Sequence, residues 1–87
     1  MKIGIRDVEI NDYAYTESPD GDFITLYGDN FNEFSIITIN GRRFETEFIN
    51  RSTIRIEHKL EAGDEICVIQ AENEDEELGR SNIIYAR

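Results

Sequence analysis

The residues of this chain best suited to nucleophilic catalysis are its one histidine, His58, and its one cysteine, Cys67. A cysteine nucleophile needs a base beside it, a third group that orients the base, and an open cleft. Cys67 instead falls within residues 66–69, an uninterrupted apolar stretch in which a thiol behaves as a small hydrophobic group. We therefore expect no enzymatic activity, no catalytic residues and no cofactor.

Carboxylates are abundant, with 19 aspartate and glutamate residues, and they gather in two places that could bind calcium. One is the run at residues 72–77, and the other combines Asp20 and Asp22 with Asp29. Calcium takes several carboxylate oxygens, but the run does not fit an EF-hand loop, and aspartates beside a proline and a glycine are typical of turns. We interpret the run as a solvated loop and predict no metal, with calcium as the alternative.

Tyr13 and Tyr15 lie two residues apart, so in an extended segment their rings share a face. Such a pair can stack on sugar rings beside carboxylates that form hydrogen bonds. Cross-strand packing is the ordinary role of neighbouring aromatic side chains in a sheet, and the chain has no tryptophan. We expect packing, and keep contact with a polysaccharide as the alternative.

The formal net charge of −10 at pH 7 argues against nucleic acid as a partner, because it repels phosphate backbones. The basic pair Arg42-Arg43 is followed by Glu45 and Glu47, which indicates a hairpin that carries charges of both signs. No apolar run approaches the roughly 20 residues of a membrane-spanning helix. Direct membrane insertion is therefore not expected.

The elements that must position these residues are predicted to be strands, because apolar residues alternate and do not recur at helical spacing. In residues 23–27, the side chains of Ile24 and Leu26 should point inward. In residues 53–58, those of Ile54 and Ile56 should point inward. Residues 65–71 carry apolar side chains on both faces, which favours a central strand. Residues 35–39 and 81–85 are further strands.

Residues that favour turns are expected to connect these strands. Gly28 and Asn30 suit a sharp turn, with Gly28 expected at positive φ, and Phe31 should return to the core. Asn40-Gly41 predicts a type I′ hairpin, in which both central residues have positive φ. Residues 42–48 should then return antiparallel, with Phe44, Thr46 and Phe48 on one face.

The N-terminal part is less regular. Residues 3–10 hold two alternating apolar pairs of different phase, which predicts a bulge or kink at Arg6-Asp7. Residues 11–22 are polar apart from residues 13–15 and end in Ser18-Pro-Asp-Gly21, a turn sequence. We interpret residues 11–22 as a loop.

About seven short, mostly antiparallel strands at regular spacing predict an all-β, immunoglobulin-like β-sandwich. The length of 87 residues corresponds to a single domain over residues 1–87. A lone cysteine cannot form an intrachain disulfide, so stability must come from the packing of the sheets.

The order of these motifs resembles that of an IPT/TIG domain, the immunoglobulin-like module of plexins and transcription factors. The matching segments are Gly28-Asp-Asn30-Phe31 at a strand end, Asn40-Gly41 after a short apolar strand, Thr53-Ile54, the stretch from Gly63 to Ile69, and Ser81-Asn82. The chain departs from the family in its prolines, since Pro19 is the only one and the family usually has others.

The resemblance implies a scaffold or interaction unit that does no chemistry of its own. We expect a domain excised from a larger bacterial surface or membrane-associated protein, extracellular or at the cell surface, that spaces domains or contacts a protein partner. The alternative is an accessory carbohydrate-binding module attached to a polysaccharide-acting enzyme. Gly28, Asn30, Phe31, Asn40 and Gly41 are expected to build the fold and to touch no ligand.

Overall fold

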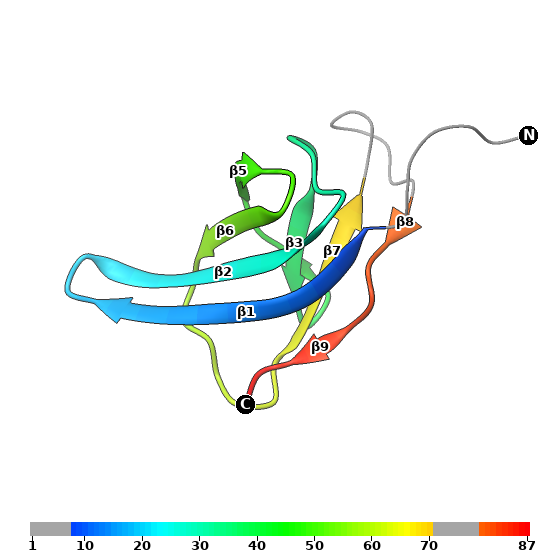
Figure 1. Cartoon of the computed structure of the whole chain (residues 1–87). Coiled ribbons are helices and arrows are strands. Elements are labelled where there is room, and N and C mark those ends of the chain that lie inside the picture. Colours follow the sequence, from blue (N-terminus) through cyan, green and yellow to red (C-terminus); the bar gives the residue numbers. More distant parts are fainter. Residues whose placement is uncertain (1–7, 71–78) are drawn as a thin grey trace, which may run out of the picture.

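The computed structural model describes residues 8–70 and 79–87, and this part of the chain forms strands and no helix. The strands are β1 (Glu9–Ser18), β2 (Gly21–Asp29), β3 (Ile36–Ile39), β4 (Arg42–Arg43), β5 (Glu47–Asn50), β6 (Thr53–Glu57), β7 (Glu65–Gln70), β8 (Gly79–Arg80) and β9 (Ile84–Tyr85). They form two antiparallel sheets (Figure 1). The predicted all-β sandwich is confirmed, although β1 and β2 are longer than expected and three strands have only two residues.

The strand order identifies the sandwich as immunoglobulin-like. One sheet has the order β1-β2-β6-β5, and in the other β7 lies between β3 and the two short strands β8 and β9, with β4 outside β3. An immunoglobulin fold places its first, second, fifth and fourth strands in one sheet and its third, sixth and seventh in the other. The two sheets follow this order when the two-residue strand β4 is left out of the count and β8 and β9 are counted as one interrupted strand along β7.

The core lies between the sheets and consists of their inward side chains. Ile24, Leu26 and Ile54 have no exposed surface, and Ile56 is 2% exposed, as the alternation in β2 and β6 predicts. The facing sheet contributes the fully buried side chains of Ile37, Ile66 and Val68. Burial of such side chains from water is the main source of stability in a chain without disulfides.

The prediction of a loop over residues 11–22 is wrong. β1 pairs with β2 from Glu9 opposite Asp29 to Ser18 opposite Gly21, with a shift in register between Ile10 and Asp12. Backbone hydrogen bonds to β2 hold the strand in place although half of its residues are exposed. The predicted turn at its end is correct, because Ser18 Oγ donates to Gly21 O at 2.7 Å across it. The bulge predicted at Arg6-Asp7 lies outside the described residues.

The turn after β2 has a different cause from the one expected. Gly28 does not have positive φ; instead, a Cβ at this position would lie 1.9 Å from Glu9 O and 2.9 Å from Cζ of Phe31. Asn30 has a φ of 66° and reverses the chain. Phe31 then returns to the core at 2% exposure, and its N–H donates to Arg51 O at 3.0 Å.

The Asn40-Gly41 hairpin forms as predicted, with φ values of 53° and 84°. The return strand is much shorter than predicted, however, because only β4 pairs with β3 before the chain crosses to the other sheet. Thr46 Oγ1 accepts a hydrogen bond from Ile37 N–H at 2.9 Å and so replaces a strand neighbour. Phe44 packs half-buried against the core, whereas Phe48 lies on β5 with 39% exposed, so the expected common face does not exist.

β7 is central and buried, as its apolar faces predict. Between β8 and β9, Ser81 N–H donates to Val68 O at 2.8 Å, and side chains supply further hydrogen bonds. Ser81 Oγ accepts from Val68 N–H at 2.9 Å, while Asn82 accepts from Ile10 N–H at 2.8 Å and donates to Ile10 O at 3.0 Å. The Ser81-Asn82 pair thereby joins the last strand to β7 and to β1 of the opposite sheet.

Candidate functional site

Tyr13 and Tyr15 lie on the inner side of β1, because they pair with the buried residues Leu26 and Ile24. Both rings pack against the core. The Tyr13 hydroxyl accepts a hydrogen bond from the backbone N–H of Arg87 at 2.9 Å, and the Arg87 guanidinium lies 5.0 Å from the centre of the Tyr13 ring. These contacts agree with cross-strand packing, and a role in sugar binding stays a prediction.

The Tyr15 hydroxyl is also engaged. It donates to Asp22 Oδ2 at 2.8 Å. Partial burial of the hydroxyl, followed by this hydrogen bond, raises the pKa of Tyr15 above its usual value. Tyr15 therefore stays protonated and donates the hydrogen bond that holds Asp22 next to the turn of the β1-β2 hairpin.

The carboxylates considered for calcium do not meet. Asp22 and Asp29 lie on the same extended strand, and at about 3.3 Å per residue they are on the order of 20 Å apart. In the part of the chain that the structure describes, no group of three or more histidine, cysteine, aspartate or glutamate side chains is arranged to hold a metal ion. The acidic run at residues 72–77 lies outside the described residues.

His58 and Cys67 have separate surroundings. The His58 ring stacks on Phe44, with ring centres 4.4 Å apart. Cys67 is 9% exposed on β7, and its Sγ lies 3.5 Å from Ser81 O. His58 directly follows β6 of one sheet, whereas Cys67 lies on β7 of the other, so the two side chains have different neighbours.

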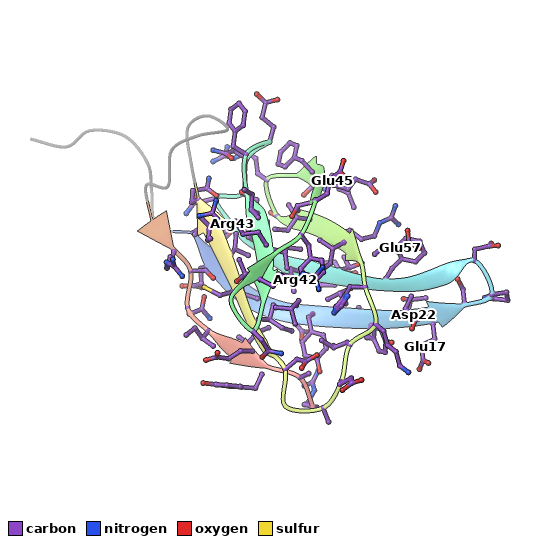
Figure 2. All side chains as sticks on the ribbon, turned by 180° about the vertical axis from the view of Figure 1, so that it is seen from behind. Glu17, Asp22, Arg42, Arg43, Glu45 and Glu57 are labelled. Atoms are coloured by element: carbon purple, nitrogen blue, oxygen red, sulfur yellow. The ribbon has the colours of Figure 1, made fainter. Side chains whose placement is uncertain are left out.

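The basic pair Arg42-Arg43 lies on β4 and is exposed. The Arg42 guanidinium lies 5.3 Å from the centre of the Phe44 ring. Figure 2 shows this pair on the same side of the molecule as Glu45 and Glu57. The mixture of charges predicted for the hairpin is therefore present around it.

The most distinctive surface is the edge of the four-stranded sheet that β5 forms, opposite the edge formed by β1. All four residues of β5 are exposed, including Phe48 at 39% and Ile49 at 45%. We call Phe48 and Ile49 the apolar edge. Tyr27, 44% exposed, lies on β2, an inner strand of the same sheet.

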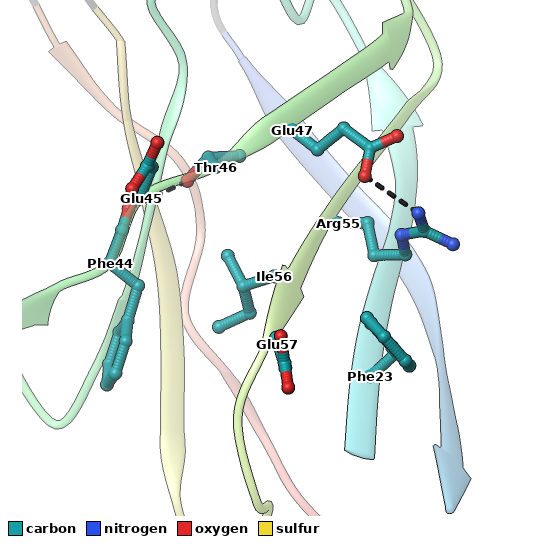
Figure 3. Close-up of a pocket in the computed structure, with 8 residues that line it drawn as sticks. All are labelled: Phe23, Phe44, Glu45, Thr46, Glu47, Arg55, Ile56 and Glu57. Atoms are coloured by element: carbon teal, nitrogen blue, oxygen red, sulfur yellow. Dashed lines mark hydrogen bonds and ion pairs between the residues drawn. The ribbon is translucent and has the colours of Figure 1, made fainter. Parts of the chain in front are cut away.

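Next to the apolar edge is a notch of about 580 Å³, lined by Phe23, Phe44, Glu45, Thr46, Glu47, Arg55, Ile56 and Glu57. Figure 3 shows Phe44 and Glu45 on one side, Glu47, Arg55 and Phe23 on the other, and Ile56 and Glu57 between them. The Arg55 side chain contacts two other residues of the lining. It forms an ion pair with Glu47 at 2.7 Å, and its guanidinium lies 5.0 Å from the centre of the Phe23 ring.

Sequence reasoning missed both the apolar edge and the notch. One signal was present, because Phe48 and Ile49 are adjacent and interrupt the alternation expected of a strand with one buried face. The structure places a register shift between Phe48 and Asn50. No sequence pattern indicates the notch, because it forms where residues 44–46 cross between the sheets and leave the edge of β6 uncovered.

No known protein family, curated protein or solved structure matches this chain. No helix among the described residues is long and apolar enough to cross a membrane.

Proposed function

We propose that this chain is a non-catalytic immunoglobulin-like module that contacts a protein partner, or a neighbouring domain, within a larger bacterial surface or membrane-associated protein. The observation that carries the proposal is the apolar edge, where Phe48 and Ile49 are 39% and 45% exposed on a strand at the edge of its sheet. Exposed apolar groups that cluster at a sheet edge are typical of contact surfaces.

The edge is suited to contact by its backbone as well. β5 is the last strand of its sheet, so one side of it offers backbone N–H and C=O groups to an added strand. Main-chain pairing would supply affinity, and Phe48 and Ile49 would supply apolar contact. The net charge of −10 keeps copies of this chain apart, which favours a different protein as partner.

Membership of the IPT/TIG family is part of the proposal. It is supported by the roles of the motif residues: Gly28 and Phe31 shape the end of β2, and Ser81-Asn82 joins the last strand to its neighbours. A scaffold role follows from the family, because the residues that carry the resemblance are used to build the sandwich.

The test is photo-crosslinking in cells that produce the protein. A benzophenone amino acid replaces Phe48 on the apolar edge, and in a matched control it replaces Tyr85, which is 59% exposed on β9 of the other sheet. We expect a discrete protein adduct at position 48 that is weak or missing at position 85, and its identification by mass spectrometry names the partner.

Two outcomes would count against the proposal. One is the lack of any protein adduct at position 48, and the other is the same diffuse set of adducts at both positions. An adduct with polysaccharide would instead favour the carbohydrate-binding alternative, which binding to a glycan array tests independently through Tyr13→Ala and Tyr15→Ala.

A further inference from the structure

Asn40 and Gly41 form the two-residue turn between β3 and β4, and this pair of residues can react with itself. Both residues are exposed, and neither lies in a strand. Asparagine is a chemically labile residue. It is most labile before glycine, because a following residue without a side chain leaves its backbone nitrogen open to reaction. Asn40 is the one asparagine of the chain that precedes a glycine.

The nucleophile of this reaction is the backbone nitrogen of Gly41, and the structure leaves it accessible. A Cβ at Gly41 would meet no atom of the described residues within 4 Å. The residues that pair next to the turn are Ile39 and Arg42, and the Gly41 N–H forms no hydrogen bond within the described part of the chain. Water or hydroxide can therefore reach the Gly41 N–H and remove its proton.

The side-chain amide of Asn40, which receives the attack, is held by the start of β7. Its Oδ1 accepts a hydrogen bond from Glu65 N–H at 2.9 Å, and its Nδ2 donates to Asp64 Oδ1 at 3.0 Å. The backbone adds a third hydrogen bond, because Asn40 N–H donates to Glu65 O at 2.8 Å. Since Asp64 is a carboxylate at neutral pH, its hydrogen bond with Asn40 is strengthened by charge.

Deamidation must break the two hydrogen bonds of the side-chain amide. The Gly41 nitrogen forms a bond to Cγ of Asn40, so the planar Cγ becomes tetrahedral and both amide atoms move. Ammonia then leaves with Nδ2, and water opens the succinimide ring to aspartate or isoaspartate. Because the hydrogen bonds to Asp64 and Glu65 are lost before ring closure, they add to the barrier of the reaction in the folded chain.

We propose that Asn40 is a site of spontaneous deamidation that Asp64 and Glu65 hold back in the folded chain, and that the reaction loosens the hairpin once it occurs. An acid at position 40 has no N–H to donate to Asp64, so two carboxylates would meet where Nδ2 and Oδ1 now lie 3.0 Å apart. Like charges at such a distance repel each other. The product therefore loses the contact that ties the Asn40-Gly41 turn to β7. This modification does not depend on a partner at the apolar edge.

The experiment is incubation of the full chain in neutral buffer, with and without urea, followed by tryptic digestion and mass spectrometry. Asn30, Asn32 and Asn40 lie in one tryptic peptide, which ends at Arg42, so Asn30 and Asn32 serve as internal controls. We expect conversion of Asn40 in urea, and a rate at least about tenfold lower without urea. Asn30 and Asn32 should react far more slowly than Asn40 in urea.

Two variants separate the contacts of Asn40 from the overall stability of the chain. Asp64→Ala removes the charged acceptor and should raise the rate of conversion in the folded chain by about tenfold. Asn82→Ala removes hydrogen bonds to Ile10 elsewhere in the sandwich and should change the rate by less than about twofold. Circular dichroism checks that both variants are folded.

A third variant, Asn40→Asp, imitates one product of the reaction. It should unfold at a lower urea concentration than wild type at neutral pH, because its new carboxylate faces Asp64. This measurement uses no deamidation rate, so it tests the contact between positions 40 and 64 even where Asp64→Ala does not fold.

Four results would overturn the inference. Wild type could react at the same rate with and without urea, or Asp64→Ala could react no faster than wild type. Equal acceleration in Asp64→Ala and Asn82→Ala would mean that global unfolding limits the reaction. An Asn40→Asp variant as stable as wild type would mean that the product does not loosen the hairpin.

Discussion

Gly28 is required because neighbouring atoms occupy the space of a side chain. Its backbone approaches the Glu9 carbonyl of β1, and the Phe31 ring lies over it. A glycine between a strand and a turn suggests positive φ, but here close packing between two strands and an aromatic ring is the reason.

We predict that Gly28→Ala lowers the free energy of unfolding by about 1–3 kcal/mol or more, because the new methyl group must displace backbone. Gly79→Ala is the control, since a Cβ there would have no atom of the described residues within 4 Å. Urea unfolding of both variants measures the difference. Equal stabilities would contradict the close approach of β1 to Gly28.

Asp64 ties the Asn40-Gly41 hairpin to the start of β7. Its Oδ2 accepts from Glu61 N–H at 3.0 Å and its Oδ1 accepts from Asn40 Nδ2 at 3.0 Å. These hydrogen bonds, with the Glu61 backbone the larger cause, lower the pKa of Asp64 from its ordinary value of 3.8. The ionised form is therefore favoured in the folded state.

A carboxyl group whose pKa is lowered by folding stabilises the protein above its unfolded-state pKa and loses this contribution as pH falls through the folded-state pKa. We predict that wild type is more stable than Asp64→Asn at pH 7 and that the difference shrinks below about pH 4. Urea unfolding at pH 7, 4 and 3 measures it. Comparing the two proteins at each pH cancels the effect of acid on the rest of the negative charge. A difference in the free energy of unfolding that does not change with pH would contradict the prediction.

At the scale of elements, the last strand is interrupted and side chains repair the interruption. Asn82 presents an amide that accepts from and donates to the backbone of Ile10, as a neighbouring strand would. Because Ile10 belongs to β1, this one side chain connects the edge of one sheet to the final strand of the other.

We predict that Asn82→Ala lowers the free energy of unfolding by about 1–3 kcal/mol, because two backbone groups of Ile10 lose their partners. Ile83→Ala, at a neighbouring position that is 51% exposed, should change it by less than about 0.5 kcal/mol. Urea unfolding and hydrogen exchange at the Ile10 amide check both. Normal protection of that amide in Asn82→Ala would rule out the bridge.

The apolar patterns of the individual strands explain which of them could be predicted from the sequence. β2, β6 and β7 were predicted with their buried faces, because each carries a clear apolar pattern. β1 was missed because it is stabilised by pairing with β2 along a largely polar stretch. The length of the strand after Asn40-Gly41 was overestimated because Thr46 ends the pairing through a side-chain hydrogen bond with Ile37, which no apolar pattern indicates.

At the scale of the molecule, the sandwich closes its core but leaves the β5 edge open. Exposed edge strands invite association, and proteins limit it with charge and bulges. Here a register shift lies between Phe48 and Asn50, carboxylates border the edge, and the chain carries a net charge of −10. These features discourage self-pairing of the edge.

The sequence by itself determined the class of fold, the inward faces of the central strands and the Asn40-Gly41 turn. These depend on the alternation of neighbouring side chains and on local φ preferences, which are properties of a few consecutive residues. Only the tertiary structure decided where the chain changes sheets, that Gly28 is needed for close packing, and that Glu45 and Glu57 line one notch. Such features depend on which distant segments pair, because the hydrogen bonds and packing between strands join residues that are far apart in the sequence.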